Sequence, residues 1–337
     1  MRPSMRRIAT EEAFATPEQV EAMTAACRST WQNLDLVLWR QLTNTRIPSV
    51  LKERLLDVDH ERLRIMDELG VDMHVLSLTA PGVQMFDADT AAGIAASAND
   101  QLAETIARHP GRYAGLAAFA PQDPERAVLE MERAISKLKL NGFILNSHTN
   151  GEYLDEPKYW PILEAAEALD APIYIHPRCP SDAMGAAYRD YRLESATWGF
   201  QAETGLHAMR ILLSGVLDRY PKLKLVLGHM GEGIPYWLWR IDYTYNAFRA
   251  PAERMQLTPS EAFKRNFTIT TSGVNSHATL KFVLEVLGVE RVMWAIDYPY
   301  QAAPGSVEFM NTAPVSDADR HKLFHGNAER VFKITTL

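Results

Sequence analysis

Short apolar runs alternate along this chain with longer amphipathic stretches. Several of the runs are almost continuously apolar instead of alternating with polar residues, which is typical of parallel strands that are covered on both faces. The pattern predicts eight strands, at residues 6–12, 71–78, 113–119, 141–146, 172–177, 223–230, 267–273 and 292–299.

The stretches between the strands have the length and periodicity of helices. They lie at residues 123–139, 157–170, 200–221 and 276–288, and a last helix is predicted at 326–334. Asp123 followed by Pro124 is typical of an N-cap and a first turn, and Gly288 stands where a helix is expected to end.

Eight strands that alternate with helices predict an α/β fold, a single (β/α)8 TIM barrel in which residues 1–337 form one domain. The segment 19–68 is long for one connection, and we expect it to form a helical capping insertion after strand 1, over the mouth of the barrel. An open doubly wound sheet is the rival, but its Gly-rich turn does not follow the first strand.

Composition and charge narrow the class of protein. The chain has 337 residues, 47% of them hydrophobic, with a net charge of −7 and no basic stripe, so we expect no nucleic-acid partner. Its two cysteines, Cys27 and Cys179, form neither a disulfide framework nor a CxxC metal site. No stretch approaches the roughly 20 apolar residues of a membrane span, and the basic start is not followed by an apolar segment. A cytoplasmic protein with no membrane partner is therefore expected.

Polar side chains gather where the predicted strands end, which is where (β/α)8 barrels carry their chemistry. Taken singly, each is explained as a turn former, a solvated strand end or a structural hydrogen-bonding group. Together, one Glu, one or two His and one Asp make a ligand set for a divalent cation, and Mn2+, Mg2+ and Zn2+ all fit it. The residues are Glu11, Glu12, Asn146, Ser147, His148, His176, His229, Thr271, Ser272 and Asp297.

Four motifs in this order, "EEAF", "YIHP", "GHMGE" and "DYPY", resemble the branch of the amidohydrolase superfamily that holds metal-dependent, non-oxidative hydroxybenzoate decarboxylases. Within that branch, "NSHTNGEYLDEP" and "GHMGEGIPYWLWRIDY" are most similar to the 5-carboxyvanillate type. The resemblance implies conversion of 5-carboxyvanillate to vanillate and CO2, by protonation of the ring carbon before CO2 leaves. The 2,3-dihydroxybenzoate and gamma-resorcylate types are alternatives, and so is a metal-dependent hydrolase or hydratase.

The resemblance also assigns roles to individual residues. It implies that Glu11, His176 and Asp297 bind one metal ion, with Mn2+ favoured, and that Asp297 also delivers the proton. Beside the substrate it places His229 and Glu232, with Arg240 and Arg46 meeting the anionic groups. Ala13 stands where hydrolytic members carry a His, which argues against a second metal. Relatives imply a homodimer or homotetramer, and no Gly-rich nucleotide motif calls for an organic cofactor.

Other residues have competing interpretations. His148 is either a further site residue or a surface histidine of its loop, and Tyr298 and Tyr300 either line the pocket or pack beneath it. Trp237 and Trp239 are interpreted as core or subunit contacts. The remaining histidines are interpreted as packing, structural or exposed groups: His60, His74, His109, His207, His277, His321 and His325.

Overall fold

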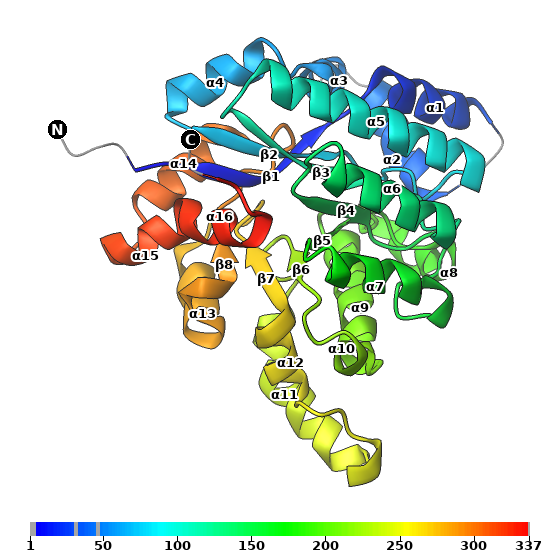
Figure 1. The fold of residues 1–337 in the computed structure, drawn as a ribbon, viewed down its shortest axis with the longest axis vertical. Helices are drawn as coiled ribbons and strands as arrows, with labels where there is room; N and C mark the ends of the chain where they lie inside the picture. The colour runs from blue at the N-terminus through cyan, green and yellow to red at the C-terminus, as the bar shows by residue number, and fades with distance from the viewer. Residues whose placement is uncertain (1–4, 30–32, 45–47, 336–337) are drawn as a thin grey trace.

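Eight parallel strands pair in chain order around a barrel in this computed structural model, which describes residues 5–29, 33–44 and 48–335 (Figure 1). The predicted barrel is confirmed, and each strand lies inside its predicted segment or within two residues of it. The strands are β1 (Ile8–Phe14), β2 (Met73–Leu78), β3 (Tyr113–Ala118), β4 (Gly142–Asn146), β5 (Ile173–His176), β6 (Leu225–Leu227), β7 (Phe267–Thr270) and β8 (Val292–Met293).

Helices surround this sheet (Figure 1). Four lie between β1 and β2: α1 (Pro17–Arg28), α2 (Leu34–Asn44), α3 (Pro48–Leu56) and α4 (Glu61–Leu69). That these helices cap the mouth stays a prediction. The later helices are α5 (Ala88–Arg108), α6 (Pro124–Ser136), α7 (Trp160–Ala168), α8 (Asp182–Gly185), α9 (Gly199–Leu213), α10 (Val216–Arg219), α11 (Ile234–Phe248), α12 (Pro259–Asn266), α13 (His277–Leu287), α14 (Ala303–Asn311), α15 (Asp317–His321) and α16 (Asn327–Phe332).

Local chemistry accounts for several helix boundaries. The Asp123 side chain accepts a hydrogen bond from the Arg126 backbone N–H, as an N-cap residue should. The prediction of a single helix at 200–221 is wrong, because Gly215 adopts a φ of 84° between α9 and α10 and interrupts the helix there. In the described part of the chain, no helix combines the length and apolar character needed to cross a bilayer.

The strands β6 and β8 are shorter than predicted, for a reason that lies in the backbone. After β6, residues 229–233 all adopt positive φ values, so the chain leaves the extended conformation at once. After β8, Asp297 has a φ of 75°. Both changes of backbone conformation occur just after the carboxyl end of a strand. In an extended strand, successive side chains point to opposite faces of the sheet, and the positive φ values here turn the side chains away from that alternation.

The barrel closes between β1 and β8 through irregular backbone contacts. Asp297 N–H donates to Glu11 C=O at 3.1 Å, and Ala13 N–H donates to Tyr298 C=O at 2.8 Å. The Glu12 carboxylate adds two bonds, accepting from Ile296 N–H at 2.9 Å and Tyr298 N–H at 3.0 Å. A side chain thus supplies acceptors that a regular strand ladder would otherwise provide, so Glu12 has a structural role at this junction.

The strand β1 carries a bulge at this junction. Its register against β2 shifts between Ala9 and Glu12, so that one extra residue is accommodated. A bulge re-aims the side chains next to it. The side chains of Glu11 and Glu12, adjacent in sequence, accordingly point in different directions. Glu12 accepts hydrogen bonds from the segment after β8, and Glu11 contacts side chains of β5 and β7.

A buried ion pair attaches α2 to the segment after β5. The Arg178 guanidinium donates through Nε to Asp35 Oδ2 at 3.1 Å, and Cys179 N–H donates to Asp35 Oδ1, also at 3.1 Å. Arg178 donates in addition to the His148 carbonyl at 2.9 Å. Because both charges are buried and fully engaged, this pair holds α2 beside the carboxyl end of β5.

Substituting Glu12 tests the closure of the barrel. Glu12→Gln keeps the size of the side chain but replaces one acceptor oxygen with an NH2 group, which then faces a backbone N–H. We expect a loss of about 1–3 kcal/mol in the free energy of unfolding, measured by urea denaturation. The exposed Glu104→Gln on α5 is the matched control and should change stability little. Equal stability of the two variants would contradict the role assigned to Glu12.

Candidate metal centre and active site

Glu11 of β1 and three side chains that end or follow β5, β6 and β8 come together: His176, His229 and Asp297. His176 Nε2 lies 3.3 Å from Glu11 Oε1, and His229 Nε2 lies 3.6 Å from the same oxygen. Asp297 Oδ2 is 3.9 Å from His229 Nε2. Since parallel strands bring their carboxyl ends to one rim, residues separated by more than 280 positions in sequence become neighbours here.

The Glu11 carboxylate is buried, and only one of its two oxygens accepts hydrogen bonds. Its Oε2 accepts from the Tyr174 hydroxyl and from Thr270 Oγ1, the latter at 3.0 Å, while Oε1 has no hydrogen-bond donor within the described residues. A Cβ at Gly228 would lie 2.6 Å from Oε2, so only glycine leaves room for this carboxylate. Burial by itself favours the neutral acid, yet the charge on His229 and the hydrogen bond from Tyr174 act in the other direction, and the pKa of Glu11 lies below its ordinary value.

His176 presents an unprotonated nitrogen to that orphaned oxygen. Its Nδ1 lies 3.0 Å from Asn146 Oδ1 and 2.8 Å from the Pro177 carbonyl oxygen, both of which are acceptors. The ring proton therefore belongs on Nδ1, and the Nε2 lone pair faces Glu11 Oε1. Two lone-pair atoms that face each other in a buried site repel unless a cation lies between them, so the donor set fits a divalent metal.

His229 and Glu232 form a pair inside the loop of positive φ values. His229 Nδ1 lies 2.8 Å from Glu232 Oε1, which orients the ring so that Nε2 points toward Glu11 and Asp297. Burial lowers the pKa of His229, but the carboxylates of Glu232 and Glu11 outweigh it and raise the pKa well above its ordinary value. The ring is thus suited to hold a proton beside Asp297.

Asp297 follows β8 with a left-handed backbone that turns its carboxylate into the cluster. Burial raises the pKa of Asp297, an effect that His229 opposes and the charge on Glu11 reinforces. Glu11, His229 and Asp297 also offer ligand atoms that all lie within 4.8 Å of one another. This set contains His229 and not His176, the imidazole that the resemblance assigned to the metal. His176 is instead placed by its own distance of 3.3 Å from Nε2 to Glu11 Oε1.

The two predicted substrate arginines have different outcomes. Arg46 lies outside the described residues. Arg240 is exposed on α11 and lines a cavity of ≈560 Å³ between α9 and α11, together with Glu232. Its contact with substrate stays a prediction.

The structure resolves several competing interpretations. Both ring nitrogens of the buried His148 are engaged, with the Cys179 carbonyl and with Gly151 N–H, so it is neither a surface residue nor a group free to act on substrate. The Tyr300 hydroxyl lies 2.6 Å from Thr79 Oγ1. Trp237 and Trp239 are 52% and 76% exposed, so their interpretation as core residues is wrong.

Two contributors to the site were missed from the sequence. Tyr174 and Thr270 both donate to Glu11, and neither stands at the last position of a predicted strand. A signal for Tyr174 was present, because it lies two residues before His176 and alternate residues of a strand share a face. Asn146, noted only as a polar strand end, fixes the tautomer of His176.

Comparison with known proteins agrees with this geometry. A family model described as amidohydrolase matches residues 38–334. A gamma-resorcylate decarboxylase from Polaromonas sp. is 39% identical over 297 residues, covering 84% of this chain and 90% of that protein.

Two solved structures of 5-carboxyvanillate decarboxylases are similar along nearly the whole chain. The enzyme from Sphingomonas paucimobilis is 51% identical with a TM-score of 0.96, covering 98% of this chain and 100% of that one. The enzyme from Novosphingobium aromaticivorans, complexed with manganese and 4-hydroxy-3-methoxy-5-nitrobenzoic acid, is 39% identical with a TM-score of 0.94, covering 98% and 97%. From its family match, its relatives and its strand-end cluster, the chain belongs to the amidohydrolase family.

Proposed function

We propose that this protein is a metal-dependent carboxy-lyase that removes CO2, without oxidation, from an ortho-hydroxylated aromatic acid. The observation that carries the proposal is the pair of facing lone-pair atoms, His176 Nε2 and the orphaned Glu11 Oε1, 3.3 Å apart beside Asp297 and His229. The decarboxylase activity of the relatives supports the same reaction class.

Glu11, His176 and Asp297 are proposed as the ligands of one divalent cation, Mn2+ by preference, with Zn2+ or Mg2+ as alternatives. When bound, the cation would hold the phenolate and carboxylate oxygens of the substrate and lower the pKa of the phenol. His176 is preferred to His229 as the nitrogen ligand because its Nδ1 proton is fixed by two neutral acceptors, which leaves Nε2 free. Manganese in a similar structure supports the choice of ion.

The proposed reaction needs a proton at the ring carbon that bears the carboxylate. Asp297 is proposed to supply that proton, because its Oδ2 faces His229 Nε2 at 3.9 Å within the cluster. A bound cation would favour the carboxylate form of Asp297, whereas the approach of an anionic substrate would favour the protonated acid. The new C–H bond forms with electrons from the phenolate-bearing ring, and the C–C bond to the carboxylate then breaks as the ring regains aromaticity. His229, held by Glu232, returns a proton to Asp297 for the next turnover.

Within this class, 5-carboxyvanillate is the proposed substrate. Its carboxylate ortho to the hydroxyl would be lost as CO2, and its second carboxylate would remain in the vanillate product. Arg240 and Arg46 are proposed to meet anionic groups of the substrate. The 51% identity to a 5-carboxyvanillate decarboxylase supports this choice, whereas similarity to gamma-resorcylate decarboxylases keeps that substrate as the alternative.

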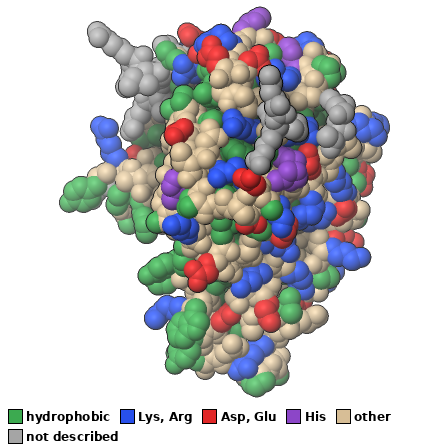
Figure 2. Space-filling model, turned by 90° about the vertical axis from the view of Figure 1, so that its left-hand side faces the viewer, with side chains coloured by type: hydrophobic (Ala, Val, Ile, Leu, Met, Phe, Trp, Pro, Cys, Tyr) green, Lys and Arg blue, Asp and Glu red, His purple; other side chains and the backbone are tan. Residues whose placement is uncertain are grey.

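A homodimer or homotetramer is the proposed assembly. Figure 1 shows α11 extending away from the barrel, and this helix carries large exposed side chains. Hydrophobic side chains also stand out along the lower end of the surface in Figure 2, the end to which α11 extends in Figure 1. The exposed aromatic residues of α11 are Tyr236, Trp237, Trp239, Tyr243 and Phe248.

His176→Ala tests the metal ligands. Because Nε2 is proposed to bind the cation, Mn2+ affinity should fall by more than the roughly 10–100-fold typical of losing a group that only orients a ligand. Metal content after dialysis, measured by mass spectrometry, gives the result. His229→Ala is the matched control and should retain metal while losing turnover. Retention of metal by the His176 variant, or its loss only from the His229 variant, would overturn the assignment.

Asp297→Asn tests the proton donor. The amide keeps an oxygen that can face the cation but does not deliver a proton, so kcat should fall by roughly 10²–10⁴-fold while bound Mn2+ is retained. Metal content and steady-state rates are measured on the same preparation. A rate near that of the unmodified protein would remove Asp297 from the acid role.

A panel of aromatic acids, read by product mass with Mn2+ present, tests the substrate. We expect 5-carboxyvanillate to yield vanillate and CO2 faster than gamma-resorcylate or 2,3-dihydroxybenzoate reacts. Vanillate, whose carboxylate is not ortho to the hydroxyl, should not react. Reactions in 18-oxygen water distinguish the hydrolase or hydratase alternative, because incorporation of solvent oxygen into the organic product would contradict decarboxylation.

A further inference from the structure

A second cavity, at the opposite end of the barrel, is lined by cations. Its walls include the start of β6 and β7 and the residue that precedes β8, so it lies at the amino-terminal rim, whereas the metal cluster lies at the carboxyl rim. Its volume is ≈170 Å³. The basic lining residues are Lys222, Lys224, Arg265, Arg291 and Arg330, and no Asp or Glu is among the described residues that line it.

The arginine side chains at this cavity donate hydrogen bonds only to neutral groups, or make no hydrogen bond with the described residues. Arg330 donates through Nη2 to the Glu290 carbonyl at 2.5 Å and to Asn327 Oδ1 at 3.2 Å, which leaves its other nitrogens without a partner in the described chain. Arg265 donates to Asn266 Oδ1 at 2.8 Å and to the Leu217 carbonyl at 2.7 Å. The Arg291 side chain makes no hydrogen bond or ion pair with any described residue.

The nearby carboxylates are engaged elsewhere. Asp170 lies 2.5 Å from Lys224 and 2.8 Å from Lys333, so it neutralises lysines at the edge of the cavity. Glu290 pairs with Lys322 at 2.5 Å. Burial, reinforced by the charge on Arg330, lowers the pKa of Arg291, an effect that Glu290 opposes. In a chain whose net charge is −7, this is a local excess of positive charge.

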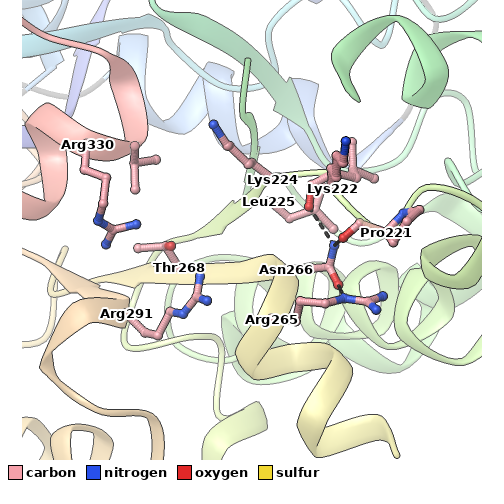
Figure 3. A pocket seen from close by; sticks show the side chains of 11 residues that line it. Pro221, Lys222, Lys224, Leu225, Arg265, Asn266, Thr268, Arg291 and Arg330 are labelled. Atoms are coloured by element: carbon pink, nitrogen blue, oxygen red, sulfur yellow. Dashed lines mark hydrogen bonds between the residues drawn. The ribbon is translucent and has the colours of Figure 1, made fainter. Parts of the chain in front are cut away.

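The donors lie on several sides of one space. Figure 3 shows the guanidinium groups of Arg291 and Arg330 on either side of Thr268, with Lys224 on the neighbouring strand segment. Thr268 is buried, and its hydroxyl makes no hydrogen bond with a described residue. Two planar guanidinium groups and a hydroxyl match an acceptor with several oxygens better than a carboxylate with two.

We propose that this cavity, formed by Arg291, Arg330 and Thr268, binds a tetrahedral oxyanion of the phosphate class. A water occupies roughly 30 Å³ in the liquid, so ≈170 Å³ holds such an anion with a few waters. The anion would offset the repulsion between the two arginines and link β7, the segment before β8 and α16. The site is independent of the decarboxylase chemistry proposed at the other rim.

Isothermal titration of the metal-loaded protein with inorganic phosphate, against chloride at equal ionic strength, tests the proposal. Arg291→Gln should weaken binding by about tenfold or more, as expected for one hydrogen bond to a charged group. Because nothing pairs with Arg291, the variant should fold and keep its activity. Arg64→Gln, on the exposed face of α4, is the matched control and should bind as the unmodified protein does.

Thr268→Val provides a second variant of similar size and should also weaken binding. Titration with glycerol phosphate separates the sources of the anion: tighter binding than inorganic phosphate assigns the site to a phosphorylated metabolite, and equal or weaker binding assigns it to free phosphate. Absence of binding to the unmodified protein would overturn the proposal. So would unchanged binding in both variants, because phosphate would then occupy another place, such as the metal cluster.

Discussion

The junction between β1 and β8 is the contact on which both the barrel and its site depend. A regular ladder does not close this edge; backbone bonds on either side of the bulge and the Glu12 carboxylate do so instead. Asp297 donates its backbone N–H to Glu11 within the same junction. The closure of the fold and the separation of Glu11 and Asp297, the two acids proposed to bind metal, are therefore fixed by one short stretch of backbone.

Unusual backbone conformations are concentrated where chemistry is expected. The run of positive φ values at 229–233 presents His229 and Glu232, and the left-handed Asp297 turns its carboxylate toward them. A left-handed non-glycine residue costs of order 1–3 kcal/mol and persists only where surrounding structure determines it. Here that structure includes the Met230 N–H bond to Thr270 C=O at 2.8 Å and the Asp297 bond to Glu11.

The two rims of the barrel carry opposite kinds of donor set. Carboxylates and imidazoles meet at the carboxyl rim, where Glu11 Oε1 lacks a hydrogen-bond donor and lies 3.3 Å from His176 Nε2, an arrangement that suits a cation. Guanidinium groups without carboxylate partners meet at the amino-terminal rim, where an anion is proposed to bind. The packed interior of the sheet, with strand residues that are almost entirely buried, separates the two.

The sequence by itself determined the element order, because the period of apolar residues and the strand-end punctuation are local properties. It also predicted that Glu11, His176, His229, Glu232 and Asp297 belong to one site, since their motifs are visible one segment at a time, and the structure brings their side chains together. It did not locate Tyr174 or Thr270 as partners of Glu11, nor the end of β6 at Leu227. Those features arise from side chains on different strands and from backbone turned by packing.

Only the tertiary structure decided which carboxylate of the adjacent pair closes the barrel, which imidazole nitrogen is free, and that basic residues from four separate segments of the chain line one cavity. Each of these depends on distances across the sheet. Distances of that kind are set by the simultaneous closure of all eight strands, which no local stretch of sequence encodes.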